Sequence, residues 1–327
     1  MRRGGSLFLV PAICVAAMLI PGADTHAQRY PDRPMRLIVG FAPGSAPDNV
    51  ARIVAPQIAA ITGQPVVVDT RQGAAGTIAT DLAAKASPDG YTIMLAVLGP
   101  TVLAPTLYPK LPYDPVKDFA PVTLLAFFPQ IVFTSPSGFK SVKELMALAR
   151  SKPCEVSYAS AGSGSLPHLS AELFATRAKV RFLHVPFKSV ALALPDLMAG
   201  RVSFAFANLG TGLPQVKAGK LTGLAVTGAA RTNLLPELPT LAEAAGLPGF
   251  EMNDWFGILL PAGTPARTVS ELHAIILKML AAPEARTPLV ALGANPTTNS
   301  PEEFGRFIKS EIGRWAEVIK VSGAKAE

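Results

Sequence analysis

Cysteine is nearly absent from this chain, which has two cysteines in 327 residues. Cys14 lies in an apolar N-terminal segment, and removal of that segment would leave Cys154 without a partner for an internal disulfide. The three histidines beyond that segment, at positions 168, 184 and 273, match no zinc-binding spacing, and no CxxC motif occurs. We therefore expect no disulfide, no metal site and no cofactor.

Charged residues are also scarce, at 16% of the chain, and they form no basic stripe. The formal net charge of +7 is spread along the sequence, so it mildly favours anionic partners and gives no sign of nucleic-acid binding. The sequence has no HExxH, GxSxG or Walker motif, and the glycines at 210 and 212 precede Gln215 where a dinucleotide fingerprint needs Gly or Ala. These absences favour a binding protein over an enzyme.

The N-terminus has the pattern of a secretory signal peptide. Arg2 and Arg3 precede an apolar run at 7–20, which is shorter than the roughly 20 residues of a membrane-spanning helix. Small residues then lead to Ala27, after which we expect cleavage and export of the remainder. A retained membrane anchor is the disfavoured alternative, because Cys14 has no lipobox and no stop-transfer charges follow the run.

Short apolar segments alternate with segments of helical period along the rest of the chain. Strands are predicted at 37–39, 64–69 and 91–97, with helices at 47–61 and 78–86. The later predicted elements are strands at 131–134, 156–160, 182–185 and 255–260 and helices at 142–150, 167–177, 191–199, 266–281 and 301–321. This alternation predicts an α/β fold with mostly parallel sheets, and a length of about 300 residues suits two lobes.

Two strand-to-helix loops are candidate anion sites, because each is small, rich in Gly or Ser and followed by a helix start. The amide N–H groups of a helix start lack partners and carry the positive end of the helix dipole. The loop residues are Phe41, Ala42, Pro43, Gly44, Ser45 and Ala46 in the first and Ser160, Ala161, Gly162, Ser163, Gly164 and Ser165 in the second. The alternative is that Ser45 and Ser165 are ordinary helix caps.

The first turn of each of these helices contains a polar side chain, Asp48 in one and His168 in the other. Asp48 complements the helix dipole but would repel an anion, so we interpret it as structural. His168 follows the second loop, where its ring can either cap the helix or donate to a ligand oxygen. Both readings of His168 stay open from the sequence.

Many local strings of this chain occur in the same order in a known family. They include Arg36-Leu37-Ile38-Val39, Phe41-Ala42-Pro43-Gly44, Gly63-Gln64-Pro65-Val66-Val67-Val68-Asp69, Pro88-Asp89-Gly90-Tyr91-Thr92, Leu111-Pro112-Tyr113-Asp114-Pro115, Ser163-Gly164-Ser165, Val185-Pro186-Phe187-Lys188 and Pro261-Ala262-Gly263-Thr264-Pro265. By these strings the chain resembles the receptor proteins of tripartite tricarboxylate transporters, often called Bug or TctC-like proteins. The resemblance covers nearly the whole chain after residue 27.

The resemblance implies a type II periplasmic-binding-protein fold, with two lobes hinged by two crossing strands near 127–130 and 252–255. Lobe 1 would comprise residues 28–128 and 255–327, and lobe 2 residues 129–254. Such a protein is expected to be a periplasmic monomer that captures a small organic carboxylate and delivers it to inner-membrane transporter subunits. Signalling to a membrane sensor kinase is the alternative, and a hydrolytic enzyme on the same fold is a less favoured one.

His168, Thr101, Lys188 and Asn208 complete the residues predicted to contact the ligand, beside the two loops. The chain also departs from the family pattern, because Ala207 stands where relatives often carry an acidic residue. An ammonium group on the ligand would therefore lose a partner. We expect a carboxylate without an amino group and with an apolar or aromatic body near Phe41, Val190 and Leu192, although Val190 and Leu192 could instead pack the core.

Overall fold

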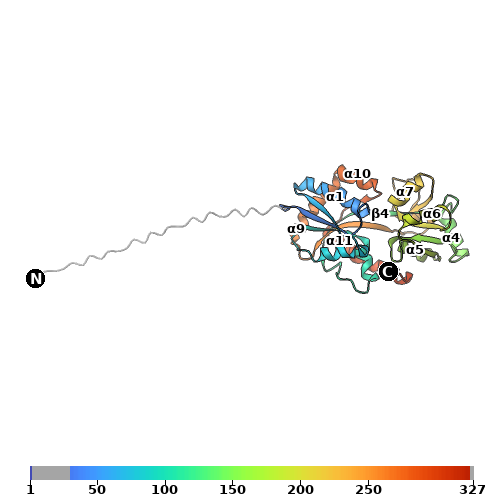
Figure 1. Cartoon of the computed structure of the whole chain (residues 1–327), viewed down its shortest axis with the longest axis horizontal. Coiled ribbons are helices and arrows are strands. Elements are labelled where there is room, and N and C mark those ends of the chain that lie inside the picture. Colours follow the sequence, from blue (N-terminus) through green and yellow to red (C-terminus); the bar gives the residue numbers. More distant parts are fainter. Residues whose placement is uncertain (2–29, 325–327) are drawn as a thin grey trace.

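The structure is a computed structural model that describes residue 1 and residues 30–324. The predicted signal peptide and its cleavage after Ala27 lie outside the described residues. Figure 1 shows two lobes side by side, with strand β4 (Phe119–Thr134) running between them. A type II periplasmic-binding-protein fold was expected from the sequence, and this two-lobed α/β arrangement confirms it.

The first lobe is built from both ends of the described chain. Its elements are β1 (Met35–Val39), α1 (Ala46–Thr62), β2 (Val66–Thr70), the 3-10 turn η1 (Ala74–Gly76), α2 (Thr77–Ala84), β3 (Thr92–Val97), the π turn η2 (Gly99–Leu103), α3 (Ala104–Leu107), β9 (Asn253–Pro261), α9 (Ala266–Ala281), α10 (Pro283–Ala291), β10 (Asn295–Pro296) and α11 (Pro301–Ser322). Strands β2, β1 and β3 are parallel, and β9 joins them antiparallel beside β3. The carboxyl ends of the three parallel strands therefore meet at one edge of the sheet.

The second lobe repeats this plan with the middle of the chain. Its elements are α4 (Val142–Ser151), β5 (Ser157–Ser160), α5 (Leu166–Ala178), β6 (Leu183–Pro186), α6 (Val190–Met198), β7 (Phe204–Asn208), α7 (Leu209–Lys217), β8 (Thr222–Val226) and α8 (Leu241–Ala245). Strands β7, β5 and β6 are parallel, in that order. The loop after β5 therefore lies at the carboxyl edge of this second sheet.

Strand β4 belongs to both sheets. Its residues Phe119–Pro129 pair with β9, and its residues Gln130–Thr134 pair with β7 and β8. The partner change falls between Pro129 and Gln130, at the crossing expected near 127–130. We propose this change as the boundary between the lobes on β4, with the start of β9 as the second crossing.

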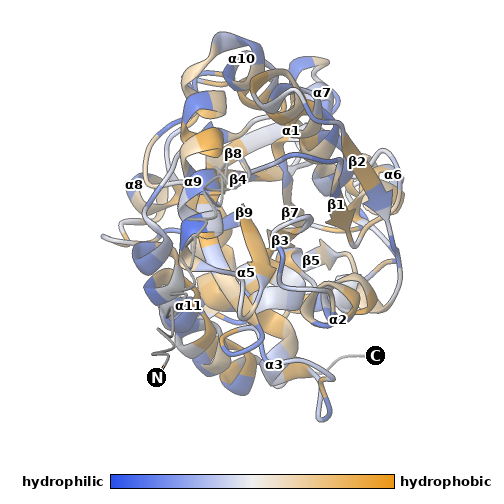
Figure 2. Ribbon diagram, turned by 90° about the vertical axis from the view of Figure 1, so that its left-hand side faces the viewer, coloured by the Kyte–Doolittle hydropathy of each residue, from blue (hydrophilic) through white to orange (hydrophobic). Residues whose placement is uncertain are grey.

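Apolar residues fill the space between sheets and helices. The inner strands are almost wholly buried, as β9 shows with seven consecutive buried residues from Trp255 to Pro261, whereas the edge strands β2 and β6 are partly exposed. Figure 2 shows hydrophobic residues along strands such as β9, while helices such as α11 and α10 carry hydrophilic residues as well. No helix within the described part of the chain is both long and apolar enough to cross a bilayer.

The structure contains elements that the sequence pattern did not predict. Strand β4 has 16 residues, of which only 131–134 were predicted. Two prolines, Pro121 and Pro129, interrupt its apolar pattern, and the pairing with β9 shifts register between Pro121 and Thr123. Irregular pairing of this kind tolerates proline inside a strand. The sequence also missed α7, β8, α8 and α10.

Candidate functional site

The two loops singled out in the sequence are built alike. Gly44 and Gly164 both have positive φ, at 81° and 76°, which favours glycine. The Gly44 N–H donates to Asp48 Oδ2 at 2.9 Å, and the Gly164 N–H donates to His168 Nδ1 at 3.0 Å. In each loop the side chain four residues ahead thus holds the glycine amide and fixes the approach to the helix.

Neither loop closes its helix with a serine cap. Ser45 and Ser165 are the N-cap residues of α1 and α5, and neither side chain accepts a hydrogen bond from its own helix. The Ser165 hydroxyl instead donates to the Gly162 carbonyl at 2.6 Å, and the buried Ser45 Oγ has no partner among the described residues. The remaining Ser and Thr N-caps, which all accept such a bond, are Ser141, Ser189, Thr240 and Ser300. The interpretation of Ser45 and Ser165 as ordinary caps is therefore wrong.

Asp48 has a structural role, as its position in the first turn of α1 indicated. Its side chain is 1% exposed and accepts from Arg52 Nε at 2.8 Å as well as from the Gly44 amide. The hydrogen bond from Arg52, reinforced by that from Gly44, holds the pKa of Asp48 below its ordinary value. The carboxylate is thus charged and already engaged with its own loop.

A cavity of about 330 Å³ lies between the lobes. Its wall on lobe 1 comes from the turn before α2, the start of α2, η2 and α3, and its wall on lobe 2 from the loop before α5. The lining residues are Ala74, Ala75, Thr77, Gly99, Leu103, Ala104, Leu107, Tyr108, Ala161, Ser163, Gly164 and Ser165. None of these described lining residues carries a charged side chain. A site of this kind recognises an anion through main-chain donors and the rest of the ligand through apolar contact.

The lobe 1 wall contains a strained turn. Gly73, Ala74, Ala75 and Gly76 all have positive φ, and for the two alanines the values are 44° and 51°. Left-handed backbone costs a residue with a Cβ atom about 1–2 kcal/mol. Strain of this kind persists where the surrounding structure requires it, often at binding sites. The sequence analysis did not select this turn, although it follows β2 at the carboxyl edge of a parallel sheet.

Phe41, the first residue of the 41–46 loop, lies against this turn. A Cβ atom at Gly76 would lie 3.0 Å from the Phe41 ring and 3.2 Å from Pro100, so Phe41 packs against the turn. The loop itself is not among the residues that line the 330 Å³ cavity. Its contact with a ligand stays a prediction.

The other predicted site residues lie at varied depths. In the second loop, Ser160 is fully buried beneath the cavity wall, and Gly162 is partly exposed beside it. Thr101 is 1% exposed, and its hydroxyl has no partner among the described residues. Lys188 is exposed, and Asn208 pairs with Gln130 where β4 changes partners.

Three further predictions concern residues outside these loops. His168 is 6% exposed and accepts from the loop instead of capping its helix. Val190 packs in the core of the second lobe, whereas Leu192 is 60% exposed. The contacts of Thr101, Lys188, Asn208 and His168 with a ligand remain predictions.

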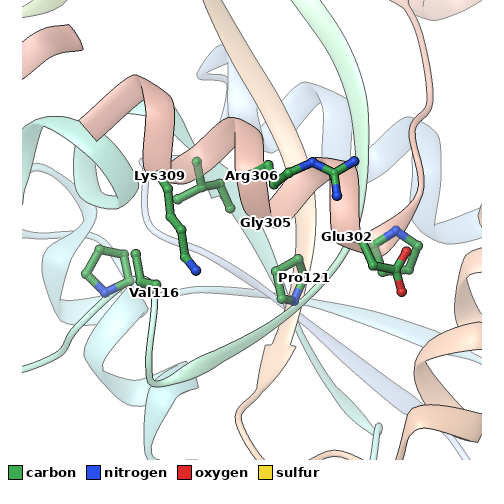
Figure 3. Close-up of a pocket in the computed structure, with 9 residues that line it drawn as sticks. Val116, Pro121, Glu302, Gly305, Arg306 and Lys309 are labelled. Atoms are coloured by element: carbon green, nitrogen blue, oxygen red, sulfur yellow. The ribbon is translucent and has the colours of Figure 1, made fainter. Parts of the chain in front are cut away.

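A different cavity, of about 360 Å³, lies on lobe 1 alone. Figure 3 shows Arg306 and Lys309 of α11 beside it, with Val116 and Pro121 on the other side. All the residues that line it belong to α11 and to segment 115–121, so it does not join the lobes. The cavity between the lobes is therefore the better candidate for a ligand that two lobes enclose.

The fold and the cavity between the lobes define the class of two-lobed solute-binding proteins. Residues 50–324 match the tripartite tricarboxylate transporter family receptor, and the chain belongs to this family of Bug proteins. It is 41% identical over 307 residues to a protein of Pseudomonas sp. strain P51 encoded in the tcbD-tcbE intergenic region, covering 93% of this chain and 91% of the relative. It is also 35% identical to BugT of Bordetella pertussis, with 93% of each chain covered.

A solved structure of R. palustris Rpa4515 with adipate has the same fold. Its TM-score to this chain is 0.78 with 37% identity, over 90% of this chain and 99% of that protein. Members of the family are solute-binding receptors. The expectation of a Bug-family receptor is thereby confirmed.

Proposed function

We propose that this protein is a periplasmic receptor that captures a small organic carboxylate between its lobes and delivers it to a tripartite tricarboxylate-type transporter. One observation carries the proposal. The serine N-caps of α1 and α5, one in each lobe, leave the first-turn amides of their helices uncapped, while the other Ser and Thr N-caps close theirs. The start of α5 borders the cavity, and in this proposal the start of α1 supplies donors to the same anion.

The carboxylate is best held at the start of α5, where Ser163, Gly164 and Ser165 line the cavity. On lobe 1 we assign its partners to the start of α2 and to the 41–46 loop. The buried hydroxyls of Ser45 and Thr101 support this assignment, because buried polar atoms usually have partners and these two have none within the described chain. A ligand oxygen would provide one.

The chain or ring that carries the carboxylate is apolar in this proposal. Leu103, Ala104, Leu107 and Tyr108 form one side of the cavity, and none of them offers a charge. Ala207 is buried and apolar where an acidic partner for an ammonium group would be expected. The favoured ligand is therefore a carboxylate without an amino group, such as a dicarboxylate with an unsubstituted chain or an aromatic acid.

Calorimetric titration of the purified protein tests this proposal. Adipate and an aromatic acid such as benzoate are to be compared with aspartate and glutamate at pH 7.5. We expect at least one of the first two to bind with a micromolar Kd, equivalent to about −8 kcal/mol, and the amino acids to bind at least tenfold more weakly. Tight binding of aspartate or glutamate would contradict the ligand class, and binding of no carboxylate would contradict the receptor function. Loss of uptake on gene deletion tests delivery.

A further inference from the structure

Three stacked rings lie behind the lobe 2 loop. Tyr158 of β5 stacks on His184 of β6, with ring centroids 4.9 Å apart and an interplanar angle of 16°. His184 in turn stacks on His168 of α5, with centroids 4.2 Å apart and an angle of 15°. The loop that lines the cavity thus rests on a pair of parallel imidazoles.

Each imidazole is hydrogen-bonded to one end of this loop. His168 Nδ1 accepts from the Gly164 N–H at 3.0 Å, and His184 Nε2 lies 2.6 Å from Ser160 Oγ. The same Ser160 Oγ accepts from the Gly162 N–H at 3.1 Å. The two rings therefore fix the amides on either side of Ser163, which lines the cavity.

We propose that His168 and His184 are positioning residues for the carboxylate-binding loop, and that ligand affinity requires His168 to be neutral. Only an unprotonated Nδ1 can accept from the Gly164 amide. A proton on that nitrogen would set two N–H groups against each other and release the glycine. It would also place a positive ring face to face with His184. The inference rests on the proposed function for its effect on affinity.

The surroundings of His168 favour a neutral ring at pH 7. Burial lowers the pKa of His168 below its ordinary value of 6.5. Among the described residues, Tyr158 of β5 stacks on His184, and Glu172 Oε1 of α5 accepts from the Tyr158 hydroxyl at 2.7 Å. The equivalent acceptor in lobe 1 is the carboxylate of Asp48, which stays charged at this pH. Acid should therefore disturb the loop of lobe 2 and leave that of lobe 1 intact.

A first experiment needs no ligand. Long-range ¹H–¹⁵N NMR spectra of the His168 ring should show the neutral form with a proton on Nε2 at pH 7.5. On acidification the ring should titrate below pH 6.5, and the Gly164 amide shift should follow the same curve, while the Gly44 amide shift stays constant. A titrating His168 ring with an unresponsive Gly164 amide would overturn the positioning role, as would a ring already charged at pH 7.5.

A second experiment measures affinity with the His168→Asn variant. An asparagine oxygen can accept from the Gly164 amide, as Asp48 does from Gly44, but it does not titrate. We expect the wild-type Kd for adipate, or for benzoate if adipate does not bind, to rise about fivefold between pH 7.5 and a pH below the His168 midpoint found by NMR, the loss typical of one hydrogen bond. The variant should bind like wild type at pH 7.5. Between the two pH values its Kd should change less than twofold, once the effect of the ligand's own ionisation is subtracted.

The matched control is His273→Asn, which changes the lobe 1 histidine that contacts the Asn299 carbonyl at 3.0 Å. It should keep the pH dependence of the wild type, and thermal melts at both pH values should show that every variant is folded. If His168→Asn and wild type lose affinity by the same factor on acidification, the inference is wrong. If no carboxylate binds at all, the proposed function fails while the NMR titration still decides the positioning role.

Discussion

Asp254 shows at the scale of one residue how the crossing between the lobes changes side-chain chemistry. It stands at the start of β9, opposite Phe128 of β4, and its Oδ1 accepts from the Trp255 N–H at 2.9 Å. Burial raises the pKa of this carboxyl to about 7, against an ordinary value of 3.8. The folded protein thus holds a proton on Asp254 that the unfolded chain releases at much lower pH.

This proton predicts a stability change for Asp254→Asn. A raised pKa in the folded state stabilises the fold below pH 3.8, and this contribution is lost as the pH rises toward 7. At pH 8 the buried carboxylate of wild type is charged, which costs stability, whereas the asparagine amide stays neutral. The variant should therefore be more stable than wild type by about 1–2 kcal/mol at pH 8. This is less than the full pKa shift implies, because Asp254 keeps some contact with solvent. Urea unfolding at pH 8 and pH 4 measures the difference, which should shrink at pH 4. A destabilised variant at pH 8 would contradict the prediction.

At the scale of secondary-structure elements, α1 and α5 share one way of starting. In both, a glycine with positive φ precedes the N-cap serine, and a side chain in the third helical position holds the glycine amide. The sequence predicted both loops because strand, small loop and helix follow each other locally. It could not predict the turn before α2, because left-handed Ala74 and Ala75 have no local signal and depend on packing around Gly76.

Glycine substitutions separate a structural from a binding role for these helix starts. Gly44→Ala and Gly164→Ala should each cost about 1–2 kcal/mol of stability, because both residues have positive φ. Each should also weaken carboxylate binding at least fivefold. Gly63→Ala is the control, since Gly63 ends α1 with φ of 73° and a Cβ atom there meets nothing within 4 Å. Thermal melts of Gly63→Ala should show a similar loss of stability, and calorimetry should show no loss of affinity. Unchanged binding by Gly44→Ala would remove the 41–46 loop from the site.

At the scale of the whole molecule, the lobes are joined by β4, which continues from one sheet into the other. The sequence pattern predicted two α/β units, and the family resemblance implied crossings near 127–130 and 252–255. Strand β4 changes partners within the first range. The sequence did not predict one strand of 16 residues, because Pro121 and Pro129 break the apolar pattern. The strand continues past both prolines because it pairs with β9. Long-range pairing of this kind leaves no local trace in a sequence.

Ligand binding should close the lobes around the cavity. We expect a saturating carboxylate ligand to reduce the radius of gyration measured by small-angle X-ray scattering, because the walls of the cavity come from both lobes. At a ligand concentration of one hundred times Kd, the free energy of unfolding should also rise by about 2.7 kcal/mol, which is measured as a higher Tm. Aspartate at the same concentration should stabilise the fold by no more than about 1.4 kcal/mol, because its expected Kd is at least tenfold higher. Saturated binding with an unchanged scattering curve would exclude closure.

The uncapped starts of α1 and α5 have a consequence for how receptors of this kind diversify. Among substitutions only proline removes a peptide N–H group, so capture of the acid group can be inherited almost unchanged. Selectivity for the remainder of the molecule rests on replaceable side chains such as Leu107 and Tyr108. A lineage could therefore exchange one nutrient for another by altering this apolar lining, and a laboratory redesign could begin at the same two positions.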